Sequence, residues 1–151
     1  MTTNSVAAIV LAAGKGTRMR SQRAKVLHEL GGEPMIARAL RAVAAIEADP
    51  IVIVVGHQAR EVEAAIKFAN ARFALQEPQR GTGDAARYAV DQLPANFTGD
   101  VLITYGDMPA IKAATLRAFL DAHRKRGAKL SFISIVLDDP AAYGRVIRDA
   151  A

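Results

Sequence analysis

Residues 7–19 read Ala-Ala-Ile-Val-Leu-Ala-Ala-Gly-Lys-Gly-Thr-Arg-Met, a short apolar run that passes directly into a glycine loop with cations. A continuous apolar run of this length is typical of a parallel strand buried on both faces, and residues 7–12 are expected to form one. Ligands bind such sheets at the carboxyl ends of the strands. The loop that follows this strand is therefore the first candidate for a binding site.

Apolar runs alternate with segments of helical periodicity along the rest of the chain. Pro34 stands at the start of the first helical pattern, Asp84 complements the start of the third, and Gly127 follows the last. The alternation predicts an α/β fold with a Rossmann-like, doubly wound and mostly parallel sheet, whose strand order is left open. The predicted strands are residues 7–12, 51–55, 72–76, 101–105 and 130–137, and the predicted helices are residues 35–48, 61–69, 84–93 and 115–126.

The composition excludes several classes of protein. The 151 residues are 51% hydrophobic and 23% charged, which is typical of a globular chain rather than a disordered one. There is no cysteine, so disulfides, thiolate-bound metals and a thiol nucleophile are excluded. No apolar run approaches the roughly 18 residues of a membrane helix, and residues 1–5 lack the cations of a secretory signal. A cytoplasmic protein without membrane contact is expected.

The formal net charge of +5 arises in one short segment. The first acidic residue is Glu29, and the residues after position 25 balance in charge. The five cations before Glu29 are Lys15, Arg18, Arg20, Arg23 and Lys25. A local cluster suits a small polyanion such as a triphosphate, whereas nucleic-acid binders more often spread their cations over a face. No nucleic-acid partner is expected, and a solvated basic loop is the simpler alternative.

The glycine loop has features of a phosphate-binding loop. Gly14 and Gly16 would let the backbone approach an anion and direct N–H groups toward it. The loop lacks the earlier glycine of a Walker A sequence, and the third glycine position of a dinucleotide fingerprint holds Met19. Arg18 and Lys25 are the candidate phosphate ligands beside it. The alternative is an ordinary glycine turn flanked by surface cations.

Three later loops carry further candidate residues. Gln76 ends a predicted strand and could present its amide to a nucleobase, accepting and donating at once, while Gly81 and Thr82 offer backbone contacts. Asp107 follows the fourth predicted strand, where a carboxylate could bind Mg²⁺. Gly144 could allow a sugar to approach closely. Each of these residues has an ordinary alternative as a turn, helix-entry or capping residue.

Taken together, the order and spacing of these loops resemble a known family. The matching segments are residues 11–19, the Lys-Val-Leu-His string at 25–28, Gln76 with residues 81–83, residues 105–107 and residues 139–145. They resemble the sugar-phosphate nucleotidyltransferases, and among these the uridylyltransferase domain of the bacterial bifunctional N-acetylglucosamine-1-phosphate uridylyltransferases/glucosamine-1-phosphate acetyltransferases. The resemblance extends over nearly the whole chain.

The resemblance implies an activity and a set of site residues. The implied reaction transfers a uridylyl group from UTP to N-acetylglucosamine 1-phosphate with Mg²⁺ as cofactor, and gives pyrophosphate and UDP-N-acetylglucosamine, a cell-wall precursor. Arg18 and Lys25 would act on the phosphates, and Asp107 would bind Mg²⁺. The implied substrate contacts are Leu11, Ala12, Ala13, Gly14, Lys25, Gln76, Gly81, Thr82, Tyr105, Gly106, Asp107 and Gly144.

Two departures from the family pattern limit these expectations. The family usually has proline before the lysine, where this chain has Ala24. The family's later sugar-binding residues, a second Mg²⁺-binding asparagine and the β-helix of acetyl transfer and trimerisation would lie beyond Ala151. Residues 1–151 are therefore expected to form one nucleotide-binding domain, incomplete at its C-terminal end. A related transferase for another nucleotide or acceptor, and a nucleotide-binding module without turnover, remain the alternatives.

Overall fold

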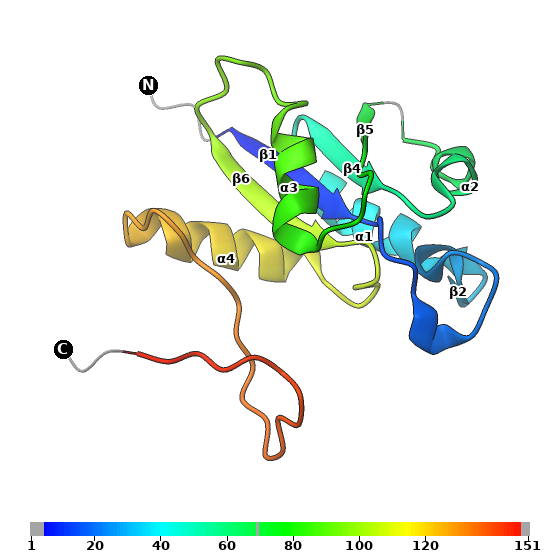
Figure 1. Ribbon diagram of the computed structural model, residues 1–151. Helices are drawn as coiled ribbons and strands as arrows, with labels where there is room; N and C mark the ends of the chain where they lie inside the picture. Colours follow the sequence, from blue (N-terminus) through cyan, green and yellow to red (C-terminus); the bar gives the residue numbers. More distant parts are fainter. Residues whose placement is uncertain (1–4, 69, 149–151) are drawn as a thin grey trace. The chain divides into compact units, whose positions relative to one another are not determined.

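The structure is a computed structural model that describes residues 5–68 and 70–148 (Figure 1). The described residues up to Leu116 form one compact unit, and those from Arg117 onward form a second. The first unit contains a four-stranded sheet and a separate two-stranded sheet. Within the described residues, no helix has the length and apolar character that a membrane crossing requires.

The main sheet has the strand order β5-β4-β1-β6, and all its strands run parallel. β1 (Val6–Leu11) and β4 (Ile51–Val55) lie in the interior and are buried at every residue, which explains their unbroken apolar sequences. β5 (Ala71–Leu75) and β6 (Asp100–Tyr105) form the two edges. The strand order reverses between β1 and β6, so the crevice at their carboxyl ends is the expected ligand position in such a sheet.

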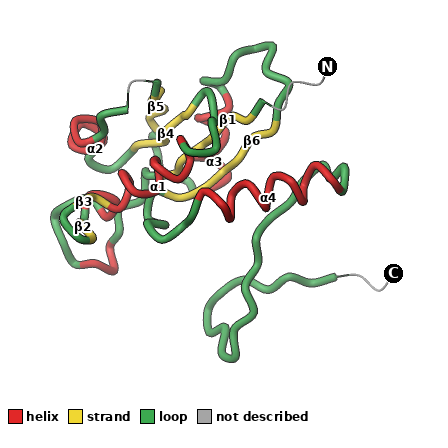
Figure 2. The backbone as a smooth tube through the Cα atoms, turned by 180° about the vertical axis from the view of Figure 1, so that it is seen from behind, coloured by secondary structure: helices red, strands yellow, loops and turns green. Residues whose placement is uncertain are grey.

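Helices cover both faces of this sheet, as a doubly wound fold requires (Figures 1 and 2). α1 (Met35–Ala44) buries Ile36, Leu40 and Val43 among its core residues. α3 (Thr82–Val90) lies on the opposite face and buries Ala85 and Ala89 in one cluster with apolar residues of β1 and β4. α2 (Ala59–Ala65) is short and buries only Val62 among its residues. The predicted α/β class is confirmed.

Most predicted elements are present with ends shifted by a few residues. The observed α1 stops at Ala44, earlier than the predicted end at residue 48. The predicted helix 61–69 corresponds to α2, which ends at Ala65, and residue 69 lies outside the described residues. α4 (Ala113–Lys125) replaces the predicted 115–126. Small elements absent from the prediction are the 3₁₀ turns η1 (Thr17–Met19) and η2 (Lys25–Leu27) and the paired strands β2 (Glu29–Leu30) and β3 (Glu33–Pro34).

The predicted strand at residues 130–137 is wrong. In the second unit this segment has no regular structure, and its large apolar side chains are exposed, with Val136 fully so. A strand exists through hydrogen bonds to a neighbouring strand, and no ladder in the described part of the chain includes these residues. β-branched and aromatic composition alone indicated a strand, which shows that this propensity depends on a pairing partner.

Candidate active site

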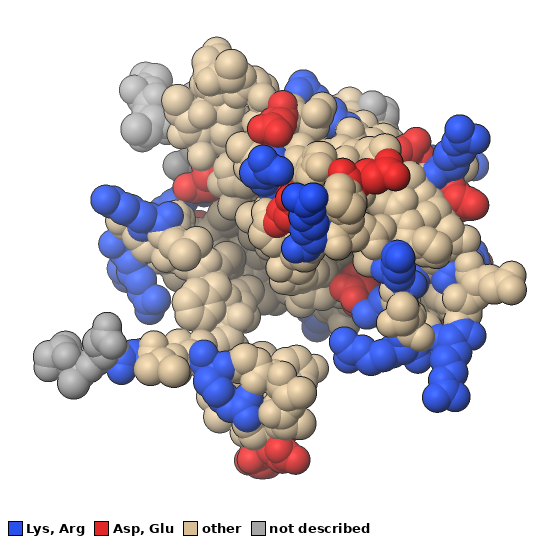
Figure 3. All heavy atoms as spheres, viewed as in Figure 1, with Lys and Arg blue, Asp and Glu red and all other residues tan. Residues whose placement is uncertain are grey.

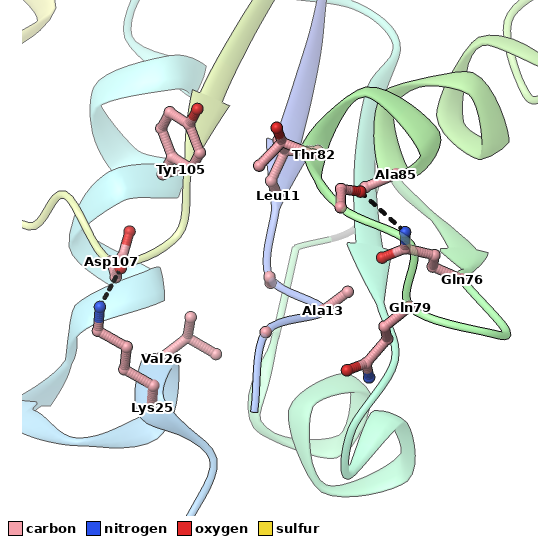
Figure 4. Close-up of a pocket in the computed structure, with 13 residues that line it drawn as sticks. Leu11, Ala13, Lys25, Val26, Gln76, Gln79, Thr82, Ala85, Tyr105 and Asp107 are labelled. Atoms are coloured by element: carbon pink, nitrogen blue, oxygen red, sulfur yellow. Dashed lines mark hydrogen bonds and ion pairs between the residues drawn. The ribbon is translucent and has the colours of Figure 1, made fainter. Parts of the chain in front are cut away.

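A pocket of about 320 Å³ opens at the carboxyl ends of β1 and β6, where the strand order reverses (Figure 4). Its walls come from the glycine loop, η2, the loop between β5 and α3, and the end of β6. The lining residues are Leu11, Ala12, Ala13, Gly14, Lys25, Val26, Gln76, Gln79, Gly81, Thr82, Ala85, Tyr105 and Asp107. The fold thus brings together side chains from loops that are far apart in the sequence, and most of them are residues that the sequence analysis selected.

A second hollow of about 300 Å³ lies along the glycine loop and shares Gly14, Lys25 and Asp107 with the first. It is also lined by Arg18, so this predicted phosphate ligand lies beside the loop rather than in the larger pocket. Space-filling atoms show Lys and Arg side chains gathered over the segment that precedes β2 (Figure 3). Arg18, Lys25 and the glycine loop therefore line this part of the site, which is an arrangement that suits a polyphosphate.

Gly16 is required in the glycine loop by its backbone and by its neighbour. Its φ of +61° lies in the left-handed region, and an added Cβ would stand 2.6 Å from the Cβ of Lys25. Gly14 has open space instead, with no atom within 4 Å of an added Cβ. Gly16 therefore allows the Cβ of Lys25 to pack closely against the glycine loop.

We expect Gly16→Ala to destabilise the protein and to displace Lys25. The left-handed backbone costs an L-residue about 1–2 kcal/mol, which would appear in the free energy of unfolding measured with denaturant. Gly14→Ala is the matched control for stability, because the same methyl group meets no atom there. Equal loss of stability in the two variants would contradict this account of the loop.

Lys25 and Asp107 join the glycine-loop side of the site to the β6 side. The Lys25 Nζ lies 2.5 Å from Asp107 Oδ2, and the two side chains are 40% and 29% exposed (Figure 4). An ion pair this exposed contributes little to stability, because water screens it and both side chains lose freedom. The pair is therefore available to exchange partners when a charged ligand enters.

Among the residues that line the larger pocket, Gln76 is the buried polar one, with 4% of its surface exposed. Its Nε2 donates to the carbonyl oxygen of Gly81 at 3.0 Å and to Asp84 Oδ2 at 2.9 Å. From the sequence, this amide was expected to donate to a ligand as well as to accept. Both amide hydrogens are instead used within the protein, and only the oxygen is left for a ligand.

Asp84 is held as an anion by its neighbours. The hydrogen bond from Gln76 is the largest cause that lowers the pKa of Asp84 below its ordinary value, and the guanidinium of Arg87 lowers it further. Arg87 Nη2 lies 3.5 Å from Asp84 Oδ1, one helical turn further along α3. The carboxylate thus remains an acceptor at neutral pH.

Gly106 does not itself line either hollow, although its neighbours Tyr105 and Asp107 line the larger one, and Gln79 lines that pocket without having been predicted. Gly106 donates its N–H to Leu11 O at 2.9 Å, and an added Cβ would come within 3.3 Å of side chains beneath it, so its position serves the junction of β1 and β6. Gly144 belongs to the second unit, and its contact with a sugar stays a prediction. Gln79 lines the pocket and packs against Gly56, where an added Cβ would lie 2.7 Å from its Nε2. The sequence signal that could have identified Gln79 is its amide side chain in the same glycine-containing loop as Gln76.

The fold and site define a nucleotide-binding α/β domain, with a glycine-rich basic loop at the reversal point of a parallel sheet. The family model described as the MobA-like NTP transferase domain matches residues 8–149, and the chain belongs to this family. The predicted membership of the nucleotidyltransferases is confirmed.

Individual relatives agree with this assignment. The chain is 46% identical over 145 residues to the bifunctional protein GlmU of Kineococcus radiotolerans, a match that covers 95% of this chain and 30% of that protein. The chain therefore spans under a third of the length of this relative. A similar match, 47% identical over 153 residues, is found with GlmU of Anaeromyxobacter dehalogenans, covering 99% of this chain and 31% of that protein.

Among solved structures, a nucleotidyl transferase from Methanothermobacter is 30% identical with a TM-score of 0.68, and the match covers 78% of this chain and 57% of that one. Rv0371c from Mycobacterium tuberculosis, solved in complex with manganese, has the same fold with a TM-score of 0.66 at 23% identity, covering 80% of this chain and 60% of that one. A solved nucleotidyl transferase is thus among the structural neighbours of this chain.

Proposed function

We propose that this chain supplies the nucleotide-binding part of a uridylyltransferase that makes UDP-N-acetylglucosamine from UTP and N-acetylglucosamine 1-phosphate. The observation that carries the proposal is the meeting of the glycine loop, Lys25, Asp107 and the buried Gln76 around one pocket. The similarity to GlmU proteins supports it. Residues 1–151 would act as a single nucleotide-binding domain whose sugar site needs further residues, and UTP as substrate favours a cytoplasmic location.

The proposed reaction is an in-line displacement at phosphorus. A phosphate oxygen of the sugar phosphate attacks the α-phosphorus of UTP, a new P–O bond forms, and the bond to the β-phosphate breaks to release pyrophosphate. No protein nucleophile is required, since such reactions depend on positioning and on stabilisation of charge. Lys25 lies where the two hollows meet, so its ammonium can face both anions. Arg18 and the loop amides face the remaining phosphate charge.

Asp107 is the residue proposed to hold a divalent metal, Mg²⁺ in our proposal. Its partly buried carboxylate already accepts one cationic group, the ammonium of Lys25, and thus fits a metal that uses one or two carboxylates and completes its shell with phosphate and water oxygens. The described residues contain no cluster of three or more acidic, His or Cys side chains that could hold a metal ion by themselves. The metal would therefore need the phosphates of the nucleotide as further ligands. When bound, the metal would neutralise phosphate charge.

The direct test is product formation with ATP, GTP, CTP, UTP and dTTP. We expect pyrophosphate release in the presence of N-acetylglucosamine 1-phosphate and UTP, measured in the longest natural form of the protein, with calorimetry of UTP on the chain itself. Preference for ATP, GTP or dTTP would favour a related transferase instead. Tight UTP binding without release of pyrophosphate from UTP in the presence of any acceptor would favour a binding module and contradict the proposed activity.

A further inference from the structure

Asp84 is a partly buried polar residue next to the pocket, and the proposed reaction gives it no role. It lies in the first turn of α3 and accepts a hydrogen bond from Gln76 Nε2 at 2.9 Å. The second hydrogen of the same nitrogen goes to Gly81 O at 3.0 Å. The side chain of Asp84 is only 17% exposed, so water competes weakly for this contact. One carboxylate and one carbonyl therefore hold a single amide group from two directions.

The orientation of the Gln76 amide follows from chemistry alone. A backbone carbonyl and an ionised carboxylate can only accept hydrogen bonds, so the NH₂ group must face both of them. Rotating the amide by 180° would place its oxygen against two acceptors and break both hydrogen bonds of the buried Gln76 side chain. The Gln76 oxygen is thereby directed away from Asp84 and Gly81. The amide is fixed before any ligand enters the pocket.

An amide fixed in this way offers a base only an acceptor, and it has no N–H left to donate. Gln76 lines the pocket and offers an acceptor, so it matches a ring N–H such as that at N3 of uracil. Cytosine carries a lone pair at N3, and two acceptors would then face each other without a proton between them. A site built to pair with an N–H rejects an analogue that lacks it far more strongly than an apolar pocket does.

We propose that Asp84 is a positioning residue that fixes the Gln76 amide and so makes the pocket select a base with a ring N–H over cytosine. The proposal rests on the proposed function, because it assumes that the nucleobase lies against Gln76. Asp84 itself does not line the pocket, and it contacts Gln76 through a hydrogen bond. Its removal should therefore change selectivity much more than affinity for UTP.

The test compares UTP and CTP binding by calorimetry in Asp84→Ala and in a matched control. We expect Asp84→Ala to lower the preference for UTP over CTP by roughly 10- to 100-fold, with UTP affinity changed only a few-fold. Asp91→Ala removes the same charge from the exposed end of the same helix and should leave the preference unchanged. Asp84→Asn keeps an acceptor oxygen and should retain most of the preference.

A second measurement reports on the amide directly. In the unaltered chain the two Gln76 side-chain N–H protons should exchange slowly with solvent in NMR spectra, and in Asp84→Ala one of them should exchange faster. If the chain prefers UTP and Asp84→Ala keeps that preference, the positioning role is wrong while the proposed function stands. Equal losses in Asp84→Asn or in Asp91→Ala would also overturn it. A chain without any preference for UTP would overturn the proposed function, and this inference with it.

Discussion

Lys25→Met is expected to weaken the use of both substrates. The variant keeps the stem that packs against Gly16 but removes the ammonium at the junction of the two hollows. Charge-assisted contacts to two phosphates would be lost, so we expect kcat/KM for UTP and for the sugar phosphate each to fall roughly 10- to 150-fold. UTP affinity measured by calorimetry should fall in parallel.

Lys15→Met is the matched control for this effect. Lys15 belongs to the same basic segment and is exposed, but it lines neither hollow. Loss of its charge should change the two kcat/KM values only slightly, and the change should shrink at high salt. A similar loss in both variants would show that the overall charge of the segment attracts the substrates and that Lys25 has no specific position.

The interior of the sheet could be predicted because the sequence of its strands reflects burial on both faces. β1 and β4 have only apolar residues, which is typical of short strands buried on both faces. Residues 130–137 are also mostly apolar, with two serines among them, yet they form no strand. The difference is the presence of neighbours, since strand pairing is a long-range property that composition does not contain. The strand order likewise could not be predicted from the sequence.

The sequence predicted which residues belong to the candidate site, but it did not predict how they contact one another. Gly14, Gln76 and Asp107 each follow a strand, and parallel strands bring such loops to one edge. The ion pair between Lys25 and Asp107 spans 82 positions of sequence, and no local pattern indicates it. Asp84 was interpreted as a complement to a helix dipole, and its bond to Gln76 shows a second role that depends on tertiary packing.

Asp107→Asn is expected to abolish the metal dependence of the site. The substitution keeps the size of the side chain but removes the charge that would hold a divalent cation and that now pairs with Lys25. Turnover should fall on the order of 100-fold or more, because phosphate charge in the transition state would lose its counter-charge. Calorimetry of UTP with Mg²⁺ and with EDTA separates this effect from simple loss of structure.

The UTP affinity of the variant relative to that of the unaltered chain should depend on whether Mg²⁺ is present. In EDTA, Asp107→Asn should bind UTP as well as the unaltered chain or better, because the carboxylate no longer repels the triphosphate or competes with it for the Lys25 ammonium. With Mg²⁺ the unaltered chain should gain affinity and the variant should not. Asp91→Asn, which alters an exposed carboxylate outside both hollows, should retain the gain. An equal gain with Mg²⁺ in Asp107→Asn would mean that the metal is held by other groups, and that Asp107 serves only as the partner of Lys25.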